Sequence, residues 1–261
     1  MAHAACIMRG ATQAKHNLLK TVIPMKRLLF LLLFPLTLFA EKTAPLQIHF
    51  ISGSKEYKSA ESLEKLKAYL EKNDQVSITT SMVTDKAKNL PNFEQIKTTD
   101  VLVVFARRLD LPEEQMKIIR SHWENDKGIV GIRTASHAFS NEDNKIFDLK
   151  ILGGNYDGHF GDEKVTVNAT KEHPLLKDLA PGVSSKLYKA KKLGPKTSVL
   201  QTGTITRKGE GSTQPVTWTN QYSEKGRAFY TSLGVPSDFE SEAFLKMLAR
   251  AIHWTAHHPL R

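Results

Sequence analysis

Residues 128–139 read Gly-Ile-Val-Gly-Ile-Arg-Thr-Ala-Ser-His-Ala-Phe, and they constrain the fold of this chain more than any other stretch. Their first part is a short apolar run with β-branched residues, which is typical of a buried strand and not of a helix. Small and polar residues follow at once. In a parallel α/β sheet, the carboxyl end of a strand and the start of the next helix form the crevice where ligands bind. We therefore expect Arg133, Thr134, Ser136 and His137 at the mouth of a crevice.

Two of these residues have a purely structural interpretation as well. Arg133 would pair with a carboxylate, and Ser136 would cap the following helix. In the functional interpretation, a cation at this turn adds to the positive end of the helix dipole and suits an anionic or polyhydroxylated ligand. The grouping of four polar residues favours the functional interpretation.

Alternating strands and helices fill the first half of the chain. Apolar or alternating segments predict strands at 45–53, 76–83, 100–105 and 129–132, with amphipathic helices after the first and third. This order predicts an α/β fold with a doubly wound, mostly parallel sheet. The loops after the first, third and fourth strands then meet at one edge, or their residues lie on the surface without a role. The residues that these loops would bring to one crevice are Glu56, Tyr57, Arg107, Arg133 and His137.

The second half of the chain contributes a glycine-rich segment and more strands. Residues 152–161 predict a loop that brings backbone close to a ligand. Within it, His159 is a candidate metal ligand or proton carrier, or a loop histidine that only binds backbone. Further strands are expected at 165–168, 197–202, 214–219 and 226–232, and a final helix at 240–257, on which His253 is interpreted as structural.

The first forty residues have a different character. Met25-Lys26-Arg27, an apolar run at 28–39 and Ala40 match the charged, apolar and cleavage regions of a secretory signal peptide. The run is short for a bilayer span. We expect cleavage after Ala40 and a periplasmic or secreted protein without stable membrane insertion, with an uncleaved N-terminal anchor as the alternative. Residues 1–24 are interpreted as an upstream extension from a misassigned start, and residues 41–261 as a single domain.

Cysteine usage and charge exclude several classes of protein. The only cysteine is Cys6, so a chain cleaved after Ala40 has no disulfide, thiolate metal site or cysteine nucleophile. Five basic residues and no acidic ones lie in residues 1–40, so cleavage lowers the formal charge from +10 to +5. The remaining lysines are interspersed with acidic residues. Nucleic acid is therefore not an expected partner.

Several of these segments, in this order, resemble the trehalose-utilisation (ThuA-like) family of the class I glutamine amidotransferase-like superfamily. The form of residues 131–139 is similar to its secreted branch. The resemblance covers nearly all of residues 41–261 and implies a flavodoxin-like three-layer sandwich. It does not bring a defined activity. The segments that carry it are residues 52–57, Arg107 with Leu111-Pro112, residues 131–139, 152–154 with Gly158-His159, His173-Pro174, residues 215–218 and residues 226–234.

One departure from the superfamily pattern concerns its chemistry. Glutamine amidotransferases carry a nucleophilic cysteine at the tight turn between strand and helix, and the resemblance places Arg133 at that position. A guanidinium cannot serve as that nucleophile, so thiol-dependent glutamine hydrolysis is excluded.

These observations lead to two hypotheses of different class. In the first, an exported enzyme processes a disaccharide or keto-sugar; in the second, the protein only binds carbohydrate. The enzyme hypothesis assigns catalysis to His137 or His159 as acid or base and to Arg133 as oxyanion stabiliser. The residues expected to bind substrate are Glu56, Tyr57, Arg107, Ser136, Tyr156 and Trp218.

No cofactor is expected. The first strand is not followed by a Gly-x-Gly-x-x-Gly turn, so no dinucleotide is indicated. A divalent metal held by His137 and His159 with Asp157 or Glu56 is the alternative, although their spacing gives it no support. Oligomeric state is left open.

Overall fold

The strands at the centre of the sheet form where the sequence has continuous apolar runs. In the computed structural model, every residue of β3 (Val101–Ala106) and β4 (Gly128–Ile132) is buried. Such runs fit strands that are covered on both faces. The structure describes residues 44–140, 142–180, 182–207 and 210–260. The expected upstream extension 1–24 and signal peptide 25–40 lie outside these residues.

One nine-stranded sheet organises the chain, in the order β2-β1-β3-β4-β11-β10-β9-β6-β7. The first five strands of this order are parallel, and the last four extend the sheet with antiparallel pairs. The remaining strands of the sheet are β1 (Leu46–Gly53), β2 (Val76–Met82), β6 (Lys164–Ala169), β7 (Gly182–Ser185), β9 (Thr197–Arg207), β10 (Glu210–Gln221) and β11 (Arg227–Thr231).

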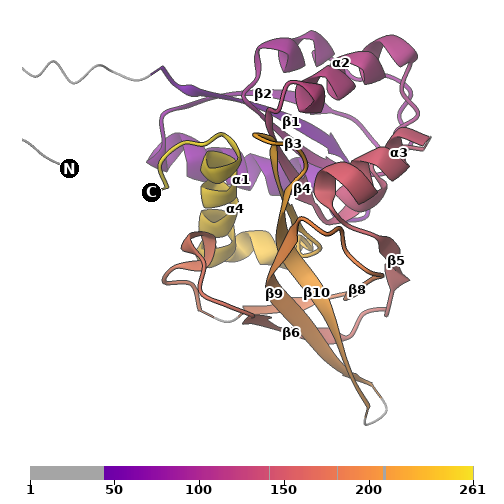
Figure 1. Ribbon diagram of the computed structural model, residues 1–261, viewed down its shortest axis with the longest axis vertical. Helices are drawn as coiled ribbons and strands as arrows, with labels where there is room; N and C mark the ends of the chain where they lie inside the picture. The colour runs from indigo at the N-terminus through magenta and orange to yellow at the C-terminus, as the bar shows by residue number, and fades with distance from the viewer. Residues whose placement is uncertain (1–43, 141, 181, 208–209, 261) are drawn as a thin grey trace, which may run out of the picture. The chain divides into compact units, whose positions relative to one another are not determined.

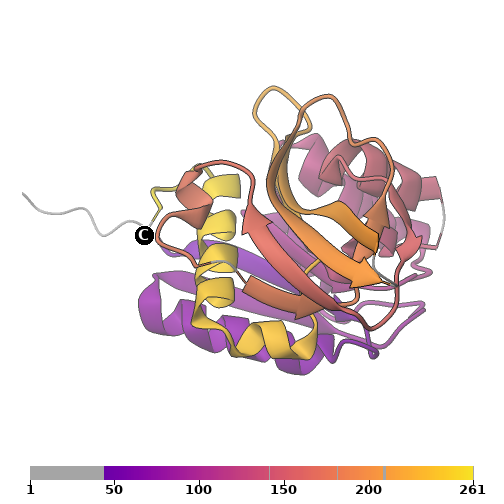
Figure 2. The same ribbon diagram turned by 90° about the horizontal axis from the view of Figure 1, so that it is seen from below.

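Helices cover both faces of the parallel part of the sheet. Helices α1 (Ser59–Asn73) and α4 (Glu242–Thr255) lie side by side on one face, and α2 (Glu113–Glu124) and α3 (Glu142–Ile146) lie on the other (Figures 1 and 2). Each face has its own apolar core: α1 and α4 contribute to one, and α2 contributes Met116, Ile119 and Trp123 to the other. The predicted flavodoxin-like three-layer sandwich is therefore confirmed.

The segment after β4 differs from the expected regular helix. A short 3-10 helix, η2 (Arg133–His137), follows the strand directly, and α3 then continues into a π-helical turn, η3 (Phe147–Leu152). The 3-10 helices η1 (Phe93–Thr98), η4 (Pro174–Leu176) and η5 (Pro236–Glu240) complete the list of short helices.

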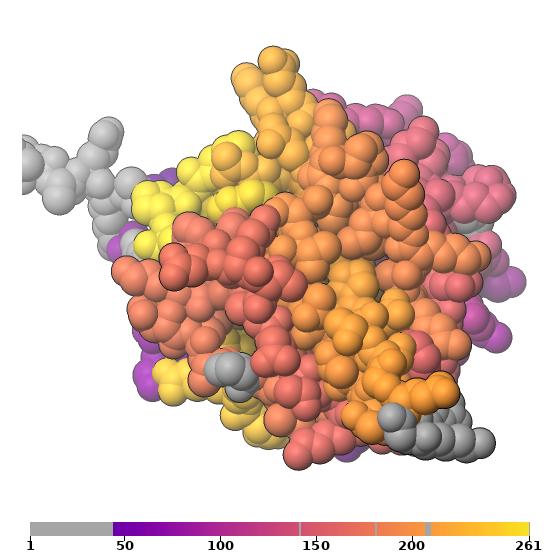
Figure 3. Space-filling model, turned by 60° about the horizontal axis from the view of Figure 1, so that its bottom comes forward, coloured from indigo at the N-terminus to yellow at the C-terminus, as the bar shows by residue number. Residues whose placement is uncertain are grey.

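The glycine-rich segment is only partly the expected loop. Its residues Tyr156–His159 form β5, which pairs with β8 (Tyr188–Ala190) in a separate two-stranded sheet. Figure 3 shows the face on which the second half of the chain gathers, coloured from salmon through orange to yellow. Within the described residues, no helix is long and apolar enough to span a bilayer.

Candidate functional site

The carboxyl ends of β1, β3 and β4 bring the predicted residues of three loops together. Glu56, after β1, accepts a hydrogen bond at 3.2 Å from Nη1 of Arg107, which follows β3. Tyr57 lies against Arg133, which follows β4, with 4.2 Å between the guanidinium carbon and the ring centroid. Parallel strands present their following loops at one edge, so this convergence follows from the sheet topology.

Arg133 is fully buried, with 0% of its surface exposed. Its φ of 48° lies in the left-handed region, so the chain turns sharply at the end of β4. Nη1 donates to the carbonyl oxygen of Ser232 at 2.6 Å, and Nη2 donates to that of Lys186 at 3.1 Å. These partners are backbone carbonyls and not the carboxylate of the structural interpretation. Through these bonds Arg133 holds together the loops that carry Ser232 and Lys186, and its side chain is not exposed.

An aromatic cluster surrounds this guanidinium. Tyr188 covers its other face, with 4.6 Å between the guanidinium carbon and the ring centroid. Tyr156 packs on Tyr188 at 4.9 Å and stacks on the imidazole of His137 at 4.5 Å between centroids. His159, at 6.4 Å from Tyr188, is exposed. Tyr57 and Tyr188 are buried, whereas Tyr156 and His137 are partly exposed.

His137 is held in its neutral form. Burial, followed by the positive charges of Arg107, Arg108 and Arg133, lowers the pKa of His137 to about 3. Its Nδ1 lies 3.1 Å from the Oγ of Ser136. A neutral imidazole suits hydrogen bonding to a ligand, and it is a weak base at neutral pH.

A charged rim lies beside the aromatic cluster. Arg107 is 3.4 Å from Asp85, and Lys186 is 3.3 Å from Glu56. Burial alone would raise the pKa of Glu56, but hydrogen bonds from Tyr57 and Lys186, with the charges of Lys186 and Arg107, lower it. Glu56 therefore stays ionised and acts as an acceptor for hydroxyl groups.

Two predicted binding residues, Ser136 and Trp218, face inward. Trp218 is 3% exposed, donates from Nε1 to the Leu152 carbonyl at 2.8 Å and packs on Tyr230. It therefore does not present its ring to the crevice. Both predicted residues border a small cleft with a volume of about 10 Å³. Its other main lining residues are Asp148, Tyr156, Tyr188 and Tyr230.

The sequence predictions missed Lys186, Tyr188 and Asp148. The first two belong to β8 and the turn before it, whose pairing with β5 is irregular and too short to produce an alternating pattern. Asp148 carried a signal, because it lies in a segment that is apolar apart from Asp148 and Lys150 and that ends directly before Gly153 and Gly154.

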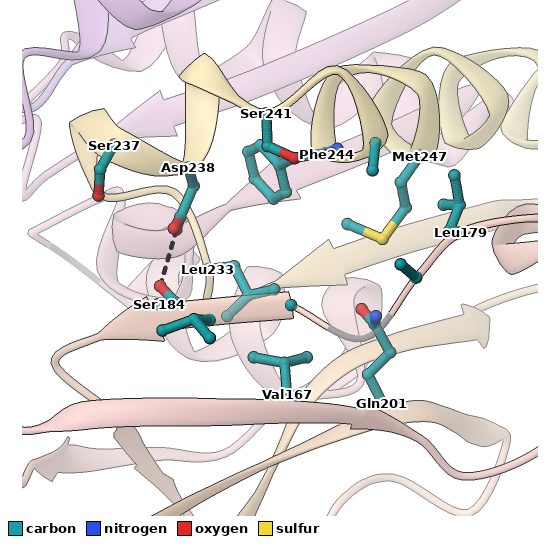
Figure 4. A pocket seen from close by; sticks show the side chains of 14 residues that line it. Val167, Leu179, Ser184, Gln201, Leu233, Ser237, Asp238, Ser241, Phe244 and Met247 are labelled. Atoms are coloured by element: carbon teal, nitrogen blue, oxygen red, sulfur yellow. Dashed lines mark hydrogen bonds between the residues drawn. The ribbon is translucent and has the colours of Figure 1, made fainter.

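A second hollow lies elsewhere, between α4 with η5 and the strands β6, β7 and β9 (Figure 4). Its walls are mostly apolar, as Phe244 and Met247 show, and Asp238 lies at one end, bonded to the Ser184 hydroxyl at 2.9 Å. None of the residues predicted from the sequence lines this hollow.

The metal alternative involves His137 and His159. Across the part of the chain that the structure describes, no three His, Cys, Asp or Glu side chains are grouped so that they would hold a metal ion. His253, which the sequence interpretation treats as structural, bonds Asp74 at 3.0 Å, away from this edge of the sheet.

Comparison with known proteins gives the family. The model of the family described as "Trehalose utilisation" (ThuA) matches residues 48–255. A ThuA-like protein from Bacteroides uniformis is similar in structure, with a TM-score of 0.60, 18% identity and coverage of 82% of this chain and 92% of that one. A ThuA-like protein from Parabacteroides merdae has a TM-score of 0.62, 19% identity and coverage of 81% and 90%.

At these identities the two structures support the fold alone. The comparison with curated proteins gave no match. The family match covers both the strands that carry the site and the loops after them, and on this ground the chain belongs to the trehalose-utilisation (ThuA) family.

Proposed function

We propose that this protein is an exported carbohydrate-processing enzyme that acts on a disaccharide or keto-sugar in the crevice at the carboxyl ends of the parallel strands, and that it is not a glutamine amidotransferase. The observation that carries the proposal is the partly open His137–Tyr156 stack beside the charged rim of Glu56, Arg107 and Lys186. An aromatic face flanked by charged donors and acceptors suits a polyhydroxylated ring. The family description, trehalose utilisation, agrees with this substrate class.

Each exposed group has a role in this proposal. The ring of Tyr156 packs against the sugar, while Arg107 and Glu56 bind its hydroxyl or carbonyl oxygens. His137 contributes a neutral imidazole next to the ligand, and His159 is the second candidate for proton transfer. Tyr57, Ser136 and Trp218 support the site from beneath, and Arg133 fixes the two tyrosines that flank it.

A non-catalytic carbohydrate-binding protein is the second candidate. The low pKa of His137 favours it, because an imidazole that is protonated only near pH 3 is a poor proton carrier at neutral pH. The same arginine, tyrosine and carboxylate would then serve binding alone.

Calorimetry with product analysis separates the two functions. The probes are trehalose and a trehalose derivative in which one ring hydroxyl is oxidised to a ketone. The enzyme function is supported if the wild type forms product, if the amount of product falls at least tenfold in His137→Ala, and if it is unchanged in the exposed control His257→Ala. Binding without product supports the second candidate. If neither sugar binds, both functions are wrong.

A further inference from the structure

Asp148 is a buried carboxyl group with one unused oxygen. Its residue is 7% exposed and lies in the π-helical turn η3. Oδ2 accepts a hydrogen bond from the backbone N–H of Tyr156 at 3.0 Å. Oδ1 is buried and has no hydrogen-bond partner among the described residues. A buried acceptor without a partner is costly, so this oxygen is available to a ligand atom.

Asp238 is a buried carboxylate of the same fold with more hydrogen bonds than Asp148. Its Oδ2 accepts hydrogen bonds from the Ser184 hydroxyl and from the backbone N–H groups of Gly234 and Val235, at 2.7 to 3.0 Å. Asp148 has one such bond. The difference points to a role for Asp148 beyond holding its own turn.

The cleft that Asp148 lines has room for about one oxygen atom. Its volume is about 10 Å³, at the lower limit of the roughly 10–15 Å³ that a single water molecule needs, so it does not take a disaccharide. Tyr156 borders the cleft and also stacks on His137 at the crevice. A sugar ring on Tyr156 would therefore direct one oxygen towards Asp148.

Asp148 is the group at this cleft that changes charge near pH 6. Burial raises its pKa to about 6, and the hydrogen bond from Tyr156 only partly opposes this. The facing phenols, Tyr156 on β5, Tyr188 on β8 and Tyr230 on β11, all have raised pKa values and stay neutral. His137 is neutral as well, and the ammonium of Lys189 lies over the ring of Phe160.

We propose that Asp148 determines the specificity of the sugar site: as a neutral carboxyl it donates a hydrogen bond to a single carbonyl oxygen that enters the cleft from a keto-sugar bound on Tyr156. This inference rests on the proposed carbohydrate function. The ionised form has no proton to donate and repels a carbonyl oxygen, whereas it accepts a hydrogen bond from a hydroxyl. Asp148 therefore admits the ketone only where it is neutral, at weakly acidic pH, and favours the corresponding alcohol once it is ionised.

The test is calorimetry from pH 5 to pH 8 with trehalose and its mono-keto derivative. If only the neutral carboxyl binds the ketone, wild-type affinity falls about tenfold for each pH unit above 6, because the competent fraction falls by that factor. Asp148→Asn keeps a donor and the shape of the side chain but does not titrate, so its affinity for the ketone does not change with pH. Asp238→Asn, a buried carboxyl outside this site, should behave as the wild type does.

Failure of the role of Asp148 and failure of the carbohydrate function give different results. If sugar binding by the wild type does not depend on pH, or if it depends on pH equally in Asp148→Asn, the role of Asp148 is wrong and the carbohydrate function stands. Absence of binding by both sugars removes the carbohydrate function and the role with it. A carbon NMR titration of the ligand-free protein is independent of any sugar: a carboxyl midpoint near 6 that is lost in Asp148→Asn is expected, and a midpoint near 4 contradicts the proposal.

Discussion

At the scale of single residues, Arg133 shows how one side chain holds together the loops at this edge of the sheet. Its backbone turns sharply with φ 48°, and its buried guanidinium lies between the rings of Tyr57 and Tyr188. The two carbonyls that it binds belong to Ser232, after β11, and to Lys186, before β8. One side chain thus joins segments that are distant in sequence. The sequence located this turn, but its burial depends on tyrosines contributed by other elements.

Arg133→Met tests this structural role. Methionine keeps most of the volume but removes both hydrogen bonds, which leaves buried carbonyl oxygens without a donor at about 1–3 kcal/mol each. The free energy of unfolding from urea denaturation should fall by about 2–4 kcal/mol, and Arg108→Met, at an exposed position, should change it by less than about 0.5 kcal/mol. Equal effects of the two substitutions would show that the guanidinium does not hold the turn.

Asp148 makes stability depend on pH. Its pKa is raised from 3.8 to about 6 in the fold, so folding favours the neutral form. The contribution of Asp148 to the unfolding free energy is complete below pH 3.8 and is lost as the pH rises through 6. Asp148→Asn avoids this loss. Relative to the wild type, the variant should gain about 2 to 2.5 kcal/mol in unfolding free energy between pH 4 and pH 8, measured by urea denaturation. A difference that stays the same at both pH values would mean that the carboxyl is not perturbed.

At the scale of elements, the sequence predicts the strands that are apolar along their whole length, because this pattern is visible in the segment alone. β3 and β4 are continuous apolar runs, and both were predicted nearly to their ends. β5 was missed because it lies in a glycine-rich segment, which is typical of loops, and because its pairing with β8 is irregular. The π-helical turn η3 has only six residues, too few to show a periodicity in the sequence. The missed residues of the site belong to η3 and to β8, the partner strand of β5, with the turn before it.

Gly154→Ala tests how η3 holds its carboxyl. A Cβ at Gly154 would lie 2.3 Å from Oδ1 of Asp148, so the carboxyl must move. Crowding of this kind costs about 1–3 kcal/mol of unfolding free energy. We also expect the NMR titration midpoint of Asp148 to shift. Gly211→Ala is the matched control, because no atom lies within 4 Å of the position of its Cβ. If both variants keep wild-type stability and the same midpoint, the contact does not position Asp148.

At the scale of the whole molecule, buried histidines make the described domain sensitive to acid. Burial lowers the pKa values of His49 and His122 to about 4 and that of His137 to about 3. All three histidines are neutral in the fold, but below pH 6.5 they become charged when the protein unfolds. Their contribution to the unfolding free energy is therefore complete above pH 6.5 and is lost as the pH falls towards 4. Asp148 and Asp238, whose pKa values are raised, act in the opposite direction.

The expected result is a fall in unfolding free energy from pH 7 to pH 5, because each of these histidines contributes a slope of up to about 1.4 kcal/mol per pH unit. Urea denaturation at several pH values measures it. His49→Asn should make the slope shallower, and the exposed control His257→Asn should not. A free energy that does not change between pH 7 and pH 5 would contradict the neutral burial of these side chains.

The central claim is that a sugar binds at the edge of the sheet where Glu56, His137 and Tyr156 meet, and amide chemical-shift mapping tests it most directly. When the ¹⁵N-labelled protein is titrated with mono-keto trehalose, the largest shifts should fall in residues 54–57, 131–138, 156–159 and 186–188. Shifts concentrated around Phe244 and Met247, at the second hollow, or no shifts at all, would contradict the account.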